Sequence, residues 1–467
     1  MHGINLNQWT IIIEKIRFMW LGGCILRRDA ITMIKRTWLI VLLLLSFLSA
    51  PRLSVGQDVY VGPDGQFEEK VLSVPYAFYN EAFGFAAGFV YGKVGYPQKQ
   101  SALLGTVMVG SKGSIMGFLI GRDLRLPWSD RLFLDPMAQI GYFNDAESYT
   151  DGNPNYPDER AGANDSDEDN YIKGDGWDNF FRLRFKYLLP VGHGKDTIIN
   201  TYVVDRGLLK SGATGGTSWN PLISGRTYFE LLPFYRWQEI KGDDDDVDIK
   251  TNGLEFSLFR DNRDFVPNPS QGSALRVDVT RDFHLFNSSD SWTVVQTEFD
   301  KYFSLGPSKT FRQRVIAFDF WTAYSPTWDV EGVTDDGQES ISNRPPSYAG
   351  ATLGGIWRMR GYPAQRFSDK AGIYYALEYR MIPKWNPFNN WPWLQEYVGI
   401  EWLQFVPFVE VGRVAPSWNF KDLHRDMKWD AGLGLRFWAK GMVARVDVAG
   451  SDEGVGVAMM VSQPFQF

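Results

Sequence analysis

The feature that most constrains the fold of this chain is a hydrophobic period of two that recurs along it. In residues 181–187, FRLRFKY, the odd positions are apolar and the even positions are cationic. Successive side chains of a β-strand point to opposite faces, so this pattern predicts a strand with one apolar and one polar face. The pattern returns near 254–259, 433–437 and 443–448. We therefore expect an all-β fold.

The composition agrees with this expectation and excludes several classes of protein. Aromatic residues make up 15% of the chain and glycines number 46, which favours strands and turns over helices. The formal charge of -7 argues against nucleic acid as a partner, because phosphate binding needs a basic face. The single cysteine excludes an intrachain disulfide and a zinc–cysteine cluster. We expect no cofactor and no metal.

The N-terminal region contains a predicted export signal. Residues 39–48, LIVLLLLSFL, form an apolar run that is too short for a membrane-spanning helix of about 20 residues. Lys35 and Arg36 precede this run and small, turn-forming residues follow it, which is typical of a secretory signal peptide over 33–56. We interpret residues 1–32 as the product of a start codon assigned too far upstream; the alternative is a genuine N-terminal extension.

After the signal we expect a short periplasmic segment, 57–75, and then one β-domain, 76–467. Alternation alone does not separate a soluble sandwich from a membrane barrel. Export, sixteen candidate strands after about residue 82 and Trp and Tyr at strand ends favour an outer-membrane barrel. Residues 75–467 allow roughly 25 residues per strand and connection, whereas a membrane strand needs about 9–11.

Three stretches of the second half carry motifs that occur together in one family. They are Asp261-Asn262-Arg263-Asp264 with Pro267, Pro269 and Gly272; Leu353-Gly354-Gly355 with Arg360-Gly361-Tyr362, Arg366-Phe367 and Glu378-Tyr379-Arg380; and 408–414, FVEVGRV, with the closing run from Gly432 to Phe465. In this order they resemble the barrel domain of the BamA/TamA superfamily, also called the bacterial surface antigen family. The resemblance covers about residues 250–467, and the preceding half matches only as generic strands.

The resemblance implies a 16-stranded antiparallel transmembrane β-barrel in the outer membrane of a Gram-negative bacterium. In such barrels the sixth extracellular loop folds into the lumen, and its Arg-Gly-aromatic tip docks on acidic residues of the wall. Arg360, Gly361 and Tyr362 match that tip, and Glu378 and Glu410 fall where the acidic partners lie. Confined guanidinium groups need carboxylates, which Arg binds in a bidentate way that Lys does not. The alternative is a solvated loop arginine.

The resemblance also implies a role in outer-membrane biogenesis or in transport of an unknown client. Most members carry periplasmic POTRA domains before the barrel, and no such domain fits within 57–75, so the activity is less well supported than the fold. Expected partners are outer-membrane lipid and lipopolysaccharide, a client or accessory periplasmic protein, and the barrel-assembly machinery, for which Phe465 and Phe467 suit the recognition signal.

Two other functions remain open. A passive or gated channel fits the width of a sixteen-stranded barrel, and Arg182, Arg184 and Lys186 would then select anions. An outer-membrane hydrolase is a distant third. It needs a base beside a nucleophile, and the chain shows no Gly-x-Ser-x-Gly or His-Glu-x-x-His motif. We therefore expect no catalytic residues and no enzyme activity.

The topology of one long acidic segment is unresolved by the sequence. If the Arg360 loop is extracellular and the strands alternate, counting places residues 144–178 at the opposite, periplasmic end. Long loops of these barrels normally face outward. Either the early strand count is off by one, or this segment is a periplasmic feature.

Overall fold

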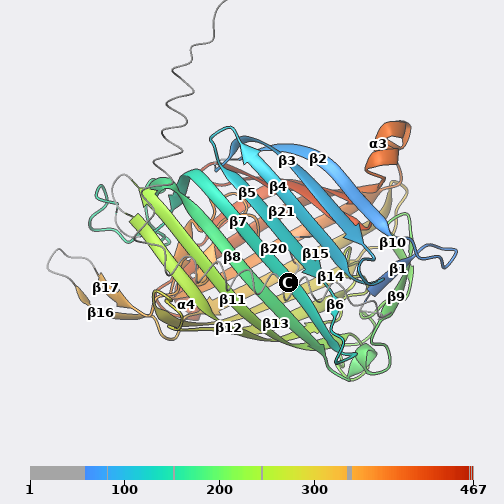
Figure 1. The fold of residues 1–467 in the computed structure, drawn as a ribbon, viewed down its shortest axis with the longest axis horizontal. Coiled ribbons are helices and arrows are strands. Elements are labelled where there is room, and N and C mark those ends of the chain that lie inside the picture. Colours follow the sequence, from blue (N-terminus) through green and yellow to red (C-terminus); the bar gives the residue numbers. More distant parts are fainter. Residues whose placement is uncertain are drawn as a thin grey trace, which may run out of the picture. The chain divides into compact units, whose positions relative to one another are not determined.

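The structure is a computed structural model, and it describes residues 58–80, 82–150, 153–242, 246–333, 339–461, 463 and 465. The predicted upstream extension and signal peptide, 1–32 and 33–56, lie outside the described residues. Sixteen wall strands form an antiparallel barrel, as predicted (Figure 1). No helix among the described residues is both long and apolar enough to cross a membrane.

Each wall strand pairs with its neighbour in the sequence. β5 and β6 both pair with β7 and together form one interrupted strand. β24 contacts β2, and we call this junction the closure. The wall strands are β2 (Lys70–Asn80), β3 (Gly84–Val94), β4 (Ala102–Gly110), β5 (Ile115–Arg122), β6 (Leu124–Arg125), β7 (Leu132–Ser148), β8 (Ile172–Leu188), β11 (Arg226–Gly242), β12 (Asp246–Asp261), β13 (Gly272–Phe283), β14 (Ser291–Ser304), β15 (Phe311–Tyr324), β20 (Ala371–Pro383), β21 (Ile400–Ala415), β22 (Lys428–Ala439), β23 (Met442–Gly450) and β24 (Val455–Val461).

The wall is inverted relative to a soluble protein. On β13 the apolar side chains of Leu275, Val277 and Val279 are exposed, whereas Arg276 and Asp278 between them are buried. In a soluble sandwich the apolar face of each strand would be covered by a second sheet. Here the polar face is the buried one, so the alternation describes an apolar exterior around a polar lumen.

The wall begins earlier than predicted. β2 starts at Lys70, within the segment 57–75 that we expected to be a periplasmic spacer, and not at 76. Pro75 lies inside this strand, opposite Phe89 of β3. Proline is tolerated in edge strands, and β2 borders the closure, so Pro75, the last residue of the expected spacer, is compatible with the wall.

Of the two alternatives that the sequence left open for residues 144–178, the structure supports a strand count that is off by one. The β7–β8 connection, residues 149–171, and the β15–β20 connection, 325–370, meet at one end of the barrel. Arg160 Nη2 lies 2.7 Å from Asp369 Oδ2, and these residues belong to the two connections. The early strand count was off by one because it began near residue 82 and omitted β2.

A three-stranded sheet lies at the other end of the barrel (Figure 1). This end sheet consists of β1 (Asp58–Val61), β9 (Asn200–Asp205) and β10 (Leu208–Ser211), with β1 parallel to β9. β9, β10 and the short helix η1 (Gly192–Lys195) belong to the β8–β11 connection. Tyr202 packs there with Trp402 and Trp438 of the wall. β1 therefore belongs to the part of the chain that fills the lumen.

The remaining elements belong to connections between wall strands. The β15–β20 connection contains two hairpins, and the second of these, β18 with β19, carries the Arg360 loop. Two further connections contain short helices. These elements are β16 (Asp329–Val333), β17 (Glu339–Ser342), β18 (Ala351–Leu353), β19 (Phe367–Asp369), η2 (Pro387–Asn390), α3 (Pro392–Tyr397) and α4 (Phe420–Leu423).

The end sheet yields a test of the fold. Trp402 Nε1 donates a 2.9 Å hydrogen bond to the carbonyl oxygen of Gly207, between β9 and β10. Trp402→Phe keeps an aromatic ring but leaves that buried carbonyl without its donor. We expect the free energy of unfolding, measured by urea titration in lipid vesicles, to fall by about 1–3 kcal/mol. The matched control Trp385→Phe, at a half-exposed tryptophan, should change it by less than about 0.5 kcal/mol. Equal effects would contradict the packing described here.

Candidate functional site

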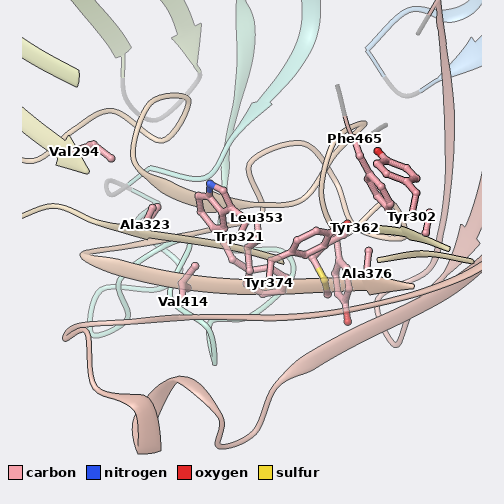
Figure 2. Packing of buried hydrophobic residues seen from close by; sticks show 14 of the residues in the cluster. Val294, Tyr302, Trp321, Ala323, Leu353, Tyr362, Tyr374, Ala376, Val414 and Phe465 are labelled. Carbon is pink, nitrogen blue, oxygen red and sulfur yellow. The ribbon is translucent and has the colours of Figure 1, made fainter. Parts of the chain in front are cut away.

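The candidate site is the lumen loop, residues 354–366, which joins β18 to β19. Its tip is a turn in which Tyr362 N donates to Met359 O at 3.1 Å, and this turn presents Arg360 and Gly361 to the wall. The loop is anchored by apolar packing, since Leu353 and Tyr362 join a buried cluster with Trp321 of β15 and Tyr374 of β20 (Figure 2). The tip is thus held by both apolar and polar contacts.

Arg360 is fully buried and is bound by carboxylates from three wall strands, β20, β21 and β23. Its Nη2 lies 3.0 Å from Glu378 Oε1, its Nε 3.1 Å from Glu410 Oε1 and its Nη1 2.8 Å from Asp447 Oδ2. The Arg360 backbone N–H also donates to Glu410 Oε2 at 2.7 Å. The guanidinium carbon lies 3.5 Å from the centre of the Phe408 ring. Every donor edge of the arginine therefore meets a specific acceptor.

Three wall arginines extend this cluster. Arg436 Nη2 lies 2.7 Å from Glu378 Oε1, and Arg380 Nε donates to Glu378 Oε2 at 2.8 Å. Arg445 forms an ion pair with Asp447. Buried charges are costly unless they are paired and hydrogen-bonded, so the arginines and carboxylates depend on one another. Withdrawal of Arg360 would leave Glu410 without its guanidinium partner, and Glu378 and Asp447 each with one partner fewer.

Gly361 and Tyr362 complete the docking of the tip. Gly361 N donates to Asp430 Oδ2 at 3.0 Å, and a Cβ at this position would lie 2.7 Å from the Asp430 Cβ. Only glycine allows this approach. The Tyr362 hydroxyl donates to Asp452 Oδ1 at 2.6 Å. Burial, followed by this bond to a carboxylate, raises the pKa of Tyr362 and keeps the phenol protonated.

The loop also touches the last wall strand and the β7–β8 connection. A Cβ at Gly456 of β24 would lie 2.2 Å from the Arg360 carbonyl oxygen, so the loop backbone rests directly on that strand. Arg366 Nε lies 2.7 Å from Glu453 Oε2, and its Nη1 donates to Ser166 Oγ at 2.8 Å. The contacts of the loop therefore run from β20 to β24, up to the strand that forms the closure.

The structure places each described site residue that the sequence suggested. Glu378 and Glu410 both bind Arg360. Phe465 is buried in the lumen, with Arg380 Cζ 5.1 Å from its ring centre, and its carbonyl accepts a 3.4 Å bond from Arg263 Nη1. Phe467 lies outside the described residues. Its part in an assembly signal stays a prediction.

Sequence reasoning missed Asp430 and Asp447 as partners of the loop. Both are polar positions in alternating strands, and Asp447 is on the same face as Arg445. Glu410 lies opposite Asp430 in the β21–β22 ladder. An alignment of the polar positions of neighbouring strands would have placed these carboxylates close together. Such an alignment requires the pairing register of β21, β22 and β23, which cannot be derived from the sequence alone.

Of the three cations proposed to select anions, Arg184 and Lys186 are paired with carboxylates of the lumen wall, whereas Arg182 lies over the ring of Phe180, with 4.9 Å between its guanidinium carbon and the ring centre. Lys186 Nζ lies 2.6 Å from both Asp123 Oδ1 and Asp135 Oδ2, and Arg184 Nη1 lies 3.3 Å from Glu230 Oε2. A cation that is paired in this way offers little charge to a passing anion.

Comparison with known proteins gives similarities at the level of the fold. CdiB from Escherichia coli matches with a TM-score of 0.50 and 10% identity over 84% of this chain and 61% of that chain. CdiB from Acinetobacter baumannii has a TM-score of 0.46 and 12% identity over 85% of this chain and 60% of that chain. BamA from Haemophilus ducreyi lacking POTRA domains 1–3 has a TM-score of 0.41 and 13% identity over 84% of this chain and 69% of that chain. No family model and no curated protein matches.

The chain has the barrel fold of CdiB from Escherichia coli. The predicted resemblance is therefore confirmed at the level of the barrel fold. This chain spans about 60% of the length of the two CdiB chains. At such low identity the comparison establishes the fold, and the activity has to be argued from the site itself.

The docked loop yields a second test. Arg360→Ala removes the guanidinium bound to Glu410 and one guanidinium partner each of Glu378 and Asp447, so we expect the free energy of unfolding to fall by about 3–5 kcal/mol and the lumen loop to become accessible to protease. Arg360→Lys keeps the charge but not the forked geometry and should give an intermediate loss. The control is Arg206→Ala, at an arginine whose side chain is 74% exposed. An unchanged unfolding transition and unchanged cleavage in Arg360→Ala would refute the docking.

Proposed function

We propose that this protein is an outer-membrane barrel of Gram-negative bacteria that acts in outer-membrane biogenesis or in transport of a protein or lipid client. The observation that carries this proposal is the contact of one buried loop with the five strands that end at the closure. A loop held in this way couples the filling of the lumen to the strands that would have to move for a client to enter.

Placement in a membrane is supported by the exterior of the barrel. Exposed apolar side chains follow the outward face of β13, as described above, and that of β24, where Val455, Val457 and Met459 are exposed. Exposed Trp391 and Trp393 lie in the β20–β21 connection at one rim. Tryptophan is enriched at the interface between hydrocarbon and water, so these positions fit a belt at that rim.

A client could use the closure. An unpaired strand edge is a template for a new strand, and a barrel that opens between β24 and β2 would expose two such edges. Release of Arg360 would free β20, β21 and β23 from their shared partner and lift the loop backbone off Gly456 of β24. The expected partners are thus a client at the closure, outer-membrane lipid and lipopolysaccharide around the wall, and the barrel-assembly machinery during insertion.

A gated channel is the second candidate function. It is favoured by the filling of the lumen from both ends, by the end sheet on one side and the lumen loop on the other. Such a pore would conduct only after one of the two moves. A permanently open channel does not fit this arrangement.

Conductance in a planar bilayer tests the proposal. We expect the refolded wild-type barrel to be nearly silent and Arg360→Ala to show openings, because loss of the ion pairs releases the loop. Arg206→Ala should behave like the wild type. Large steady openings in the wild type would contradict the proposal and leave an open channel.

A deletion strain separates the two candidate functions. If the protein acts in biogenesis or client transport, its loss should change the protein or lipid composition of the outer membrane. Complementation with the Arg206→Ala control should restore that composition, whereas Arg360→Ala should not. An unchanged membrane composition, together with loss of uptake of a small solute, would instead support the gated channel.

A further inference from the structure

A second cluster of carboxylates, separate from those that bind Arg360, lies on the lumen side of β14 and β15. Asp300 and Asp319 are directly opposite each other in the β14–β15 ladder, and both are buried, with exposed fractions of 0% and 1%. Glu298 lies two residues before Asp300 and therefore on the same face of the strand. One oxygen from each of the three carboxylates lies within 4.8 Å of the other two.

The hydrogen bonds around this cluster do not account for its charge. Tyr302 donates to Asp300 Oδ2 at 3.1 Å, and Arg358 forms an ion pair with Glu298. Asp300 Oδ1 and Asp319 Oδ1 are both buried and have no hydrogen-bond partner. Like charges directly opposite in a ladder are destabilising, and a buried carboxylate oxygen without a partner carries a large desolvation cost. Both unpartnered atoms belong to the pair of opposed aspartates.

The other cations near the cluster are already engaged. Arg263 Nη2 lies 2.7 Å from Asp261 Oδ2, and Arg380 Nη2 lies 2.8 Å from Glu378 Oε2. With all three carboxylates ionised, Arg358 offsets one of the three charges and a formal charge of about −2 is left. That remainder equals the charge of one divalent cation.

We propose that Glu298, Asp300 and Asp319 bind a calcium ion in the lumen. The donor set contains only carboxylate oxygens, which hard cations prefer, and it contains no histidine or cysteine that would favour a transition metal. Ca²⁺ binds oxygens at about 2.3–2.6 Å, so ligand atoms around one ion lie up to about 5 Å apart, and the observed spacing fits. Water supplies the remaining ligands, and Glu298 is partly exposed, which provides a path for entry.

The site is coupled to the lumen loop. Arg358 is two residues before Arg360, its guanidinium carbon lies 4.4 Å from the centre of the Trp321 ring, and it shares Glu298 with the bound cation. Occupancy of the site and the position of the loop are therefore linked. This inference does not depend on the identity of a client, so it can hold even if the proposed function fails.

The test uses the full refolded barrel after treatment with a chelator. Terbium(III) serves as the probe, because it replaces Ca²⁺ at oxygen sites and its luminescence is sensitised by a nearby tryptophan such as Trp321. We expect saturable luminescence that added Ca²⁺ displaces, and a higher thermal unfolding temperature with Ca²⁺ than with chelator. Asp300→Asn and Asp319→Asn should each weaken the affinity at least about tenfold. The control variants Asp165→Asn and Asp167→Asn, in the acidic β7–β8 connection, should retain the wild-type affinity.

A second variant keeps the test decisive if the asparagine variants fail to fold. Arg358→Gln removes the competing positive charge, and we expect it to raise the affinity for both ions several-fold. The absence of a saturable site in the wild type would overturn the proposal, and so would wild-type affinity in a folded Asp300→Asn or Asp319→Asn. If Ca²⁺ does not change the unfolding temperature of the wild type, and Asp319→Asn is more stable than the wild type, the two aspartates share a proton. That result would also overturn the proposal.

Discussion

The burial of one guanidinium group organises the lumen of this barrel. Arg360 is removed from water, so its charge has to be matched by carboxylates at hydrogen-bond distance, and these come from β20, β21 and β23. Two of those carboxylates, Glu378 and Asp447, in turn bind wall arginines, which gives a network in which no member can leave without cost to the others. The network specifies where the loop lies more strictly than apolar packing alone would.

The second constraint is the inverted wall. Because the apolar face of each strand is directed outward, the polar face has to be satisfied inside. The chain does this with ion pairs across neighbouring strands and with its own segments at both ends of the lumen. The end sheet brings Tyr60 of β1 against Tyr202 of β9, with ring centres 5.9 Å apart. At the other end, the ring of Tyr362 in the lumen loop packs against the ring of Phe367 in β19, with ring centres 5.1 Å apart. A barrel of this kind opens only when one of these segments moves.

The sequence predicted those parts of the structure that are carried by local patterns. The period of two in 181–187 corresponds to a wall strand, and Arg360-Gly361-Tyr362 with Glu378 and Glu410 corresponds to the docked tip. These features could be predicted because an alternating pattern and a short motif are each contained within a few consecutive residues. The barrel class follows from export and strand number taken together with the alternation.

Other parts depend on pairings between distant residues. The parallel pairing of Val59 with Thr201 joins a four-residue strand to a segment far along the chain, and no periodic pattern in the sequence predicts this pairing. The first wall strand, β2, precedes residue 82, where the predicted strands begin, and its omission changed the end of the barrel to which the β7–β8 connection was assigned. Asp430 and Asp447 required a register across β21, β22 and β23. The opposed Asp300 and Asp319 pair depends on the same kind of information.

The most direct test of the central claim is a double-mutant cycle between Arg360 and Glu410, which are joined by both the side chain and the backbone of the arginine. The free energy of unfolding would be measured for Arg360→Gln, Glu410→Gln, the double variant and the wild type in the same vesicles. The account predicts that the two losses are far from additive, with a coupling energy of about 1–3 kcal/mol. Additive losses would show that the buried arginine and its carboxylate contribute independently, and would contradict the account.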